Sequence, residues 1–219
     1  MLYYLFEYLE NQFQFPGASL FNYISFRSAA AVITSLLISM LFGKKIIDFL
    51  KSKQIGESIR DLGLKDQDQK EGTPTMGGLI IIFSTLIPVL LFTNLKNIYI
   101  ILLILTMIWM GVIGFIDDYL KVTRKDTGGL PGFTKFLIEA IISILILIWI
   151  INITTELMPT GLAFPFFKEL IIDLGWFYIP FAAFVIVGTA NSVNLTDGLD
   201  GLAIVPVMIC AGVFLIISY

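Results

Sequence analysis

The stretch IYIILLILTMIWMGVIGFIDDYLK, residues 98–121, decides the class of protein to which this chain belongs. Its first 19 residues carry no charge, and the adjacent carboxylates of Asp117 and Asp118 follow them directly. About 20 apolar residues are enough for a helix to cross a bilayer. The stretch therefore predicts a membrane-spanning helix that ends on two acids, and acids at a membrane edge are functional candidates because placing them there is costly.

The composition of the whole chain agrees with a membrane protein. Of its 219 residues 57% are hydrophobic and 14% are charged, and the mean hydropathy is +0.90, whereas a soluble domain has about 25% charged residues. The net charge of −3 gives no reason to expect nucleic acid as a partner. The chain has no histidine, which excludes histidine bases and histidine metal ligands, and its one cysteine, Cys210, excludes an internal disulfide.

We predict an all-α, polytopic membrane protein that forms a single integral-membrane domain over residues 1–219. Helices are required because the backbone polar groups of a spanning segment must be satisfied within it. Six spans are predicted, of which the second and sixth are short: 21–43, 76–93, 98–116, 136–153, 176–193 and 202–218. Residues 154–175 are expected to form an external loop with a short amphipathic piece on the membrane interface.

The distribution of lysine and arginine orients these spans. Seven basic residues follow the first span, at positions 44, 45, 51, 53, 60, 65 and 70, and four follow the third, at 121, 124, 125 and 135. The loops after the second and fourth spans hold only Lys96 and Lys168. Basic loops are cytoplasmic, so we expect the N-terminus and position 219 outside. Because Glu7 and Glu10 precede any basic residue, no cleaved signal peptide is expected.

With this topology, three polar motifs fall at the cytoplasmic face. They are KEGTPTMGG (70–78), DDYLKVTRK (117–125) and NSVNLTDGLDG (191–201). The segments are far apart in sequence but are expected at one membrane depth. This pattern predicts a site built from several loops at one face of the membrane.

The acid pair allows an ordinary and a functional explanation. Asp117 and Asp118 project about 100° apart on a helix, so they cannot form one clamp by themselves. Lys121 lies one turn beyond Asp117 on the same face, so the pair could be solvated acids with an ion pair at a helix end. In the functional explanation one aspartate binds Mg²⁺ and the other acts in catalysis, since magnesium sites use one or two carboxylates plus substrate phosphates.

The other two motifs also have alternatives. NLTDGLDGLA supplies Asn194, Asp197 and Asp200, which are either caps of a helix-to-helix turn or three oxygen donors around a ligand. GTPTMGG either caps a closely packed helix or receives an anion at the helix start, with Lys70 adding charge. Most loop lysines are explained by topology alone. The better candidates for binding are those nearest the motifs: Lys70, Lys121, Lys125 and Lys135.

Together, acids for Mg²⁺, lysines for phosphates and apolar helices beside them predict phosphoryl transfer from a soluble phosphate donor to a lipid acceptor. A small ion-coupled transporter is the alternative of another class. That alternative predicts acids near the middle of the membrane and an internal repeat. Here the acids lie at the ends of predicted spans, and the sequence shows no repeat.

GTPTMGG (72–78), GFIDDYLK (114–121) and NLTDGLDGLA (194–203) resemble the signatures of the polyprenyl-phosphate N-acetylhexosamine-1-phosphate transferases, from about residue 27 to the end. The first and third most resemble the peptidoglycan branch of that family. The resemblance implies an enzyme of the bacterial cytoplasmic (inner) membrane, with its active site on the cytoplasmic face. It would transfer phospho-MurNAc-pentapeptide from UDP-MurNAc-pentapeptide to undecaprenyl phosphate with Mg²⁺, giving lipid I and UMP. A branch that transfers N-acetylglucosamine-1-phosphate from its UDP carrier is the close alternative.

The resemblance also implies roles for individual residues. Asp117 and Asp118 would be the catalytic acids, by direct displacement or by a two-step covalent route, and Asp117 and Asp197 would hold the metal. The substrate-binding residues would be Lys70, Thr75, Lys121, Lys125, Lys135, Asn194 and Asp200. A homodimer is implied as well.

One departure from the family pattern affects these expectations. Family members have about ten spans, a third essential aspartate and a histidine-rich cytoplasmic loop, all C-terminal to the matched region. This sequence ends at Tyr219 after an apolar run and has no histidine. We therefore expect it to be the N-terminal portion of the enzyme and to be inactive alone.

Overall fold

The computed structural model describes residues 1–52, 76–124, 129–154, 158–164, 167, 170–197 and 201–218. These residues are mainly helical and belong to an all-α polytopic membrane protein. They fall into two compact units, Met1–Pro131 and Gly132–Tyr219, each of which is described by itself. The predicted single domain over 1–219 stays a prediction.

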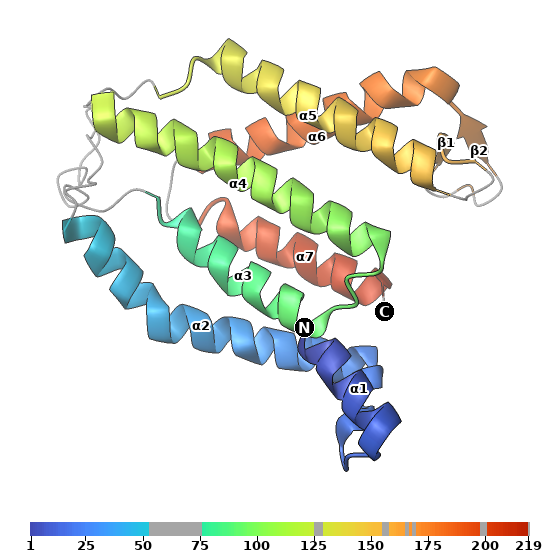
Figure 1. Cartoon of the computed structure of the whole chain (residues 1–219). Coiled ribbons are helices and arrows are strands. Elements are labelled where there is room, and N and C mark those ends of the chain that lie inside the picture. Colours follow the sequence, from blue (N-terminus) through green and yellow to red (C-terminus); the bar gives the residue numbers. More distant parts are fainter. Residues whose placement is uncertain are drawn as a thin grey trace. The chain divides into compact units, whose positions relative to one another are not determined.

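The first unit is built on three helices, α2 (Ile24–Ser52), α3 (Gly78–Phe92) and α4 (Ile98–Arg124). In Figure 1, α3 lies between α2 and α4 and contacts both. Gly111 permits the close approach of α4 to α3, because a Cβ there would lie 2.6 Å from Cδ1 of Ile82. The buried stripe of α4 contains Leu102, Ile113 and Asp117, so an acid continues the packed face of the helix.

A separate helix, α1 (Leu2–Phe13), precedes the first predicted span. A short 3₁₀ helix, η1 (Ala18–Asn22), follows it, and the ring of Phe6 stacks on Phe21 with 3.8 Å between centroids. The Tyr4 hydroxyl donates to Oδ1 of Asn94 across 3.1 Å, which joins α1 to the turn after α3. The first span therefore begins at Ile24, three residues after the predicted start at 21.

The second unit contains α5 (Gly132–Ile153), α6 (Tyr178–Thr196) and α7 (Ile204–Ser218). α5 packs against α6, and the two helices run in opposite directions (Figure 1). Between them, β1 (Gly161–Ala163) pairs antiparallel with β2 (Ile171–Asp173), and a 3₁₀ helix, η3 (Gly175–Phe177), leads into α6. The described part of the loop predicted to hold an amphipathic piece thus forms a small hairpin.

Four helices are long and apolar enough to cross a membrane: Ile24–Ser52, Ile98–Arg124, Gly132–Ile153 and Gly175–Thr196. The second and sixth predicted spans correspond to α3 and α7, which have 15 residues each, so their shortness is confirmed. Whether they complete six crossings stays a prediction, as does the outside position of the N-terminus.

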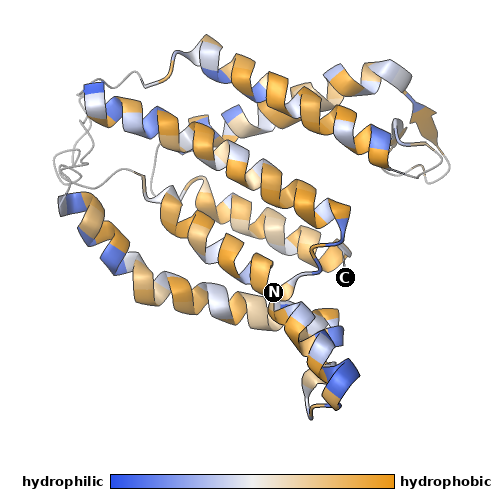
Figure 2. Ribbon diagram, viewed as in Figure 1, coloured by the Kyte–Doolittle hydropathy of each residue, from blue (hydrophilic) through white to orange (hydrophobic). Residues whose placement is uncertain are grey.

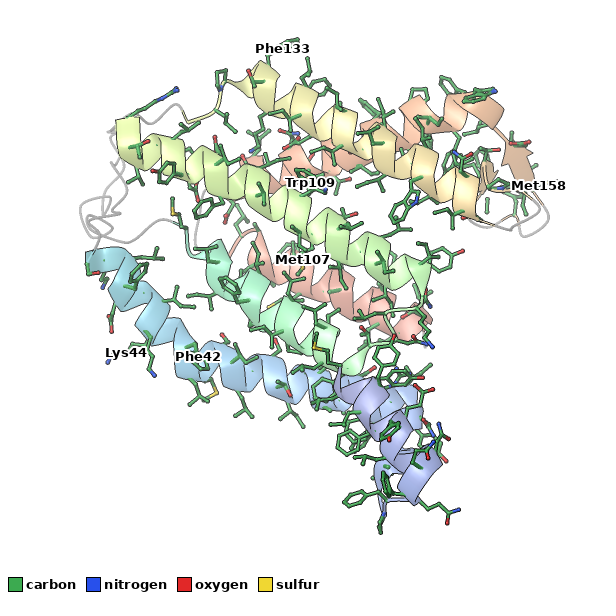
Figure 3. The ribbon with its side chains drawn as sticks, viewed as in Figure 1. Phe42, Lys44, Met107, Trp109, Phe133 and Met158 are labelled. Carbon is green, nitrogen blue, oxygen red and sulfur yellow. The ribbon has the colours of Figure 1, made fainter. Side chains whose placement is uncertain are left out.

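Most residues of the helices are hydrophobic, as the orange colouring of the ribbon in Figure 2 shows. Leu103 on α4 is 72% exposed and Phe184 on α6 is 75% exposed. Figure 3 shows the side chains of Trp109 on α4 and Phe133 at the start of α5, and both are exposed as well. Such extensive apolar surface is stable in lipid rather than in water, which agrees with a multi-pass membrane protein.

Candidate functional site

The acid pair and its lysine form a cluster near the end of α4, within the first unit. Nζ of Lys121 lies 2.7 Å from Oδ2 of Asp117 and 3.4 Å from Oδ1 of Asp118. The ion pair one turn apart, which the ordinary explanation of the acid pair included, is present, and the same lysine also reaches the second acid. The sequence predicted that the helix ends on the two acids. In the structure α4 continues to Arg124, so both acids lie within the helix, two turns before its end. We call Asp117, Asp118 and Lys121 the α4 cluster.

The chain after α4 comes back to this cluster. The backbone N–H of Leu130 donates a hydrogen bond of 2.7 Å to Oδ1 of Asp117. Gly129 before it has a φ of +57°, and a Cβ at this position would collide with Oδ1 of Asp117 and lie 2.8 Å from Cε of Lys121. A left-handed φ and a close approach both favour glycine here. The sequence did not predict this contact.

The two aspartates have different surroundings. Asp117 is only 8% exposed, and each of its carboxylate oxygens has a partner, the Lys121 ammonium on one and the Leu130 amide on the other. The side chain of Asp118 is 36% exposed, and its contact with Lys121 is the longer of the two. Asp118 therefore presents the more accessible carboxylate, while Asp117 holds the lysine and the returning chain in place.

The cluster fits a divalent cation only in part. Carboxylate oxygens are the ligands Mg²⁺ prefers. Within the described ranges, however, no three His, Cys, Asp or Glu side chains come together closely enough to hold a metal ion. A magnesium site using Asp117 or Asp118 would thus need further oxygens, such as substrate phosphates.

The candidates of the second unit lie at one end of α5 and α6. Asn194 is exposed in the last turn of α6, and Asp197 is exposed at its C-cap, where its backbone N–H donates to the Val193 carbonyl across 3.1 Å. Lys135 is half-buried in the first turn of α5. The remaining candidates lie outside the described residues: Lys70, Thr75, Lys125 and Asp200.

The structure also shows a buried polar pair that the sequence reasoning missed. Glu139 in α5 is 3% exposed, and its Oε2 accepts a 2.6 Å hydrogen bond from Nδ2 of Asn191 in α6. The same amide group donates to the Val187 carbonyl across 2.9 Å. The sequence could have identified Glu139, because it is an acid within the predicted span 136–153. Acids within membrane spans are functional candidates by default.

The described helices define a polytopic membrane protein, and α4 carries a lysine-bridged acid pair. Residues 100–219, more than half of the chain, match the model of glycosyl transferase family 4, and the chain belongs to this family. The matched segment contains the α4 cluster, Glu139, Asn191 and the Asn194–Asp197 segment. Residues 70–82 match signature 1 of phospho-N-acetylmuramoyl-pentapeptide-transferase.

Three curated relatives bear the name phospho-N-acetylmuramoyl-pentapeptide-transferase. The protein of Flavobacterium psychrophilum is 45% identical over 244 residues, covering 93% of this chain and 60% of the relative. That of Flavobacterium johnsoniae is 43% identical over 245 residues, with the same coverage. The Bartonella quintana protein is 48% identical over 206 residues, covering 94% of this chain and 57% of the relative. The chain thus spans about 60% of the length of these relatives.

Proposed function

We propose that the protein transfers phospho-MurNAc-pentapeptide from UDP-MurNAc-pentapeptide to undecaprenyl phosphate, giving lipid I and UMP, the first membrane step of peptidoglycan synthesis. The α4 cluster is the observation that carries this proposal, because it places two acids and a lysine near the end of a membrane-spanning helix. The signature at residues 70–82 and the shared name of the three relatives support the choice of sugar substrate.

The reaction moves a phosphoryl group between two anions, so charge neutralisation and positioning dominate catalysis. An oxygen of the lipid phosphate forms a new bond to the β-phosphorus of the nucleotide sugar. The bond from that phosphorus to the oxygen bridging it to the α-phosphate breaks, and UMP leaves with the electron pair. The Asp117–Asp118 pair supplies a carboxylate that accepts the proton of the lipid phosphate, and Lys121 balances charge beside it.

Mg²⁺ belongs to this proposal as well. When bound, it would neutralise the diphosphate of the nucleotide sugar, which is what divalent cations supply in phosphoryl transfer. Asp117 and Asp197 are the proposed ligands. Both side chains offer carboxylate oxygens, the ligands that Mg²⁺ prefers, and the side chain of Asp197 is exposed.

The remaining assignments follow the family resemblance. We propose that Lys121, Lys135 and Asn194 contact the substrates, together with four residues outside the described ranges, Lys70, Thr75, Lys125 and Asp200. We also propose that the protein lies in the bacterial inner membrane, that its active site faces the cytoplasm, and that it forms a homodimer. The basic residues that follow the first and third predicted spans in the sequence support the cytoplasmic orientation.

The test is an assay of UMP release by membranes that contain the protein expressed from its complete reading frame. Release should require Mg²⁺, undecaprenyl phosphate and UDP-MurNAc-pentapeptide together, and the lipid product should carry the peptide. A protein that instead uses UDP-N-acetylglucosamine would overturn the proposed substrate and point to the related N-acetylglucosamine-1-phosphate transferases.

A further inference from the structure

The buried pair Glu139–Asn191 belongs to the second unit and has no role in the reaction proposed above. Glu139 is 3% exposed in α5, a helix long and apolar enough to cross a membrane, and it reaches α6 through its bond to Asn191. A carboxylate in such surroundings is costly unless it is hydrogen-bonded. Its bond to Asn191 is short, at 2.6 Å, and joins residues 52 positions apart.

The other buried residues of α5 and α6 are apolar, apart from Ser143, whose hydroxyl has no hydrogen-bond partner among the described residues. On α5 the buried stripe contains Glu139, Ser143 and Leu147 at four-residue spacing, and on α6 it contains Ala183 and Val187. The Ser143 hydroxyl is 1% exposed and has no hydrogen-bond partner within the described residues. Apolar packing is not directional, so these side chains by themselves set the axial position of α6 on α5 only loosely. A polar pair at a helix interface is a device that fixes register.

The pair is one turn away from two candidate substrate-binding residues. Lys135 precedes Glu139 by four residues on α5, and Asn194 follows Asn191 by three residues on α6. Residues three or four apart lie on the same side of a helix. Because α5 and α6 run in opposite directions, both steps lead toward the same end of the helix pair. A fixed Glu139–Asn191 contact therefore sets the depth of Lys135 relative to Asn194.

We propose that Glu139 and Asn191 are positioning residues, which lock α6 against α5 so that Lys135 and Asn194 present one binding surface to the nucleotide sugar. This inference rests on the proposed function for the identity of the ligand. The positioning itself is a property of the second unit and can be measured without a substrate.

The kinetic test compares variants in the UMP-release assay, using protein from the complete reading frame in membranes. Glu139→Leu removes the acceptor while keeping the site apolar and filled. It should raise KM for UDP-MurNAc-pentapeptide about tenfold, the equivalent of one lost hydrogen bond, with kcat within about twofold. Asn191→Leu should do the same, and the double variant should be no worse than either single one because both remove one interaction.

Two further variants separate positioning from general damage to the core. Glu139→Gln keeps an oxygen that accepts from Asn191 and should restore KM to within about twofold of the wild type. Ser143→Ala removes a hydroxyl one turn away that has no partner in the described structure, and it should leave KM unchanged. A wild-type KM in Glu139→Leu, or an equal rise in Ser143→Ala, would overturn the positioning role.

A second measurement does not depend on activity. Nitroxide labels at Lys135→Cys and Asn194→Cys, in a Cys210→Ser background, report the separation of the two helix ends by electron paramagnetic resonance. Glu139→Leu should broaden or shift the distance distribution, and Glu139→Gln should restore it. An unchanged distribution in Glu139→Leu would contradict the proposal. If the wild-type protein releases no UMP, the proposed function fails while this measurement still decides the positioning.

Discussion

The amide of Leu130 donates to Oδ1 of Asp117 across 2.7 Å, while Lys121 occupies Oδ2 of the same carboxylate at the same distance. One acid therefore fixes both a side chain of its own helix and the chain that returns after the helix. Asp118 beside it contacts the same lysine but lies more open to its surroundings. Asp117 and Asp118 therefore make different contacts, so substituting one is expected to affect the structure differently from substituting the other.

Gly129→Ala should disturb the α4 cluster. An alanine there would have to adopt a φ of +57° and would place a methyl group against Asp117 and Lys121, which costs about 1–2 kcal/mol for the backbone alone. We expect UMP release to fall at least roughly tenfold because the Leu130 contact is lost. Gly212→Ala is a matched control, since a Cβ has open space there in α7. Wild-type rates in Gly129→Ala would show that the returning chain does not support the site.

Asp117→Asn and Asp118→Asn should each lower turnover by roughly 10²-fold or more, the usual contribution of a positioned acid or base. Asp48→Asn, which changes an exposed acid on α2, serves as the control and should leave turnover unchanged. Initial rates of UMP release at saturating substrate give the comparison, with circular dichroism to verify the fold. Near-normal rates in both cluster variants would remove the catalytic assignment from this pair.

Lys121→Met should destabilise the protein as well as inactivate it. The substitution removes the Lys121 ammonium from the nearly buried Asp117, which costs about 1–2 kcal/mol for a pair whose lysine is one-third exposed. The double variant Asp117→Asn with Lys121→Met removes both charges and should recover part of the lost stability without recovering activity. Thermal unfolding in detergent measures the first effect, and UMP release measures the second. If the double variant were the least stable of the three, the ion pair would not be the source of the effect.

The hairpin of β1 and β2 provides a pH-dependent contact. The Thr160 hydroxyl and the Gly175 amide donate to Asp173, and these bonds hold the pKa of its carboxyl below its ordinary value of 3.8. A lowered pKa means that the contact stabilises the hairpin at neutral pH and is lost as the pH falls through the folded-state pKa. Thr160→Val should raise the pKa of Asp173 toward the ordinary value. A carboxyl titration by nuclear magnetic resonance measures it, and an identical titration in the variant would contradict the assignment.

The sequence predicted those features that helical periodicity determines. The uncharged run before Asp117 predicted a spanning helix, and the four-residue step from Asp117 to Lys121 predicted their ion pair, because both follow from 3.6 residues per turn. Helix ends were less accurate: the prediction stopped at residue 116, where hydropathy falls, whereas α4 continues to Arg124. Charged residues with good helix propensity extend a helix beyond the membrane without changing its apolar pattern.

Contacts between distant segments could not be read from the pattern. The Leu130 bond to Asp117 depends on how the chain turns after α4, and Glu139 meets Asn191 only because α5 packs on α6 in one register. The sequence did not predict α1 as a helix, because Glu7 and Glu10 interrupt its apolar residues and make the segment too polar to resemble a membrane span. Its helical form is supported instead by aromatic contacts such as Phe6 on Phe21.

The brevity of α3 has a consequence for the surrounding lipid. Its 15 residues extend about 22 Å at 1.5 Å per residue, whereas the hydrocarbon layer is about 30 Å thick. Its neighbour α2, with 29 residues, is nearly twice as long. A spanning helix shorter than the hydrocarbon layer is accommodated by local thinning of the bilayer, by snorkelling of flanking residues or by oligomerisation. If α3 crosses the membrane, as we predict, the bilayer must adapt in this way beside it. A spanning α3 would then make the activity of the reconstituted protein depend on acyl-chain length, with shorter chains matching α3 better.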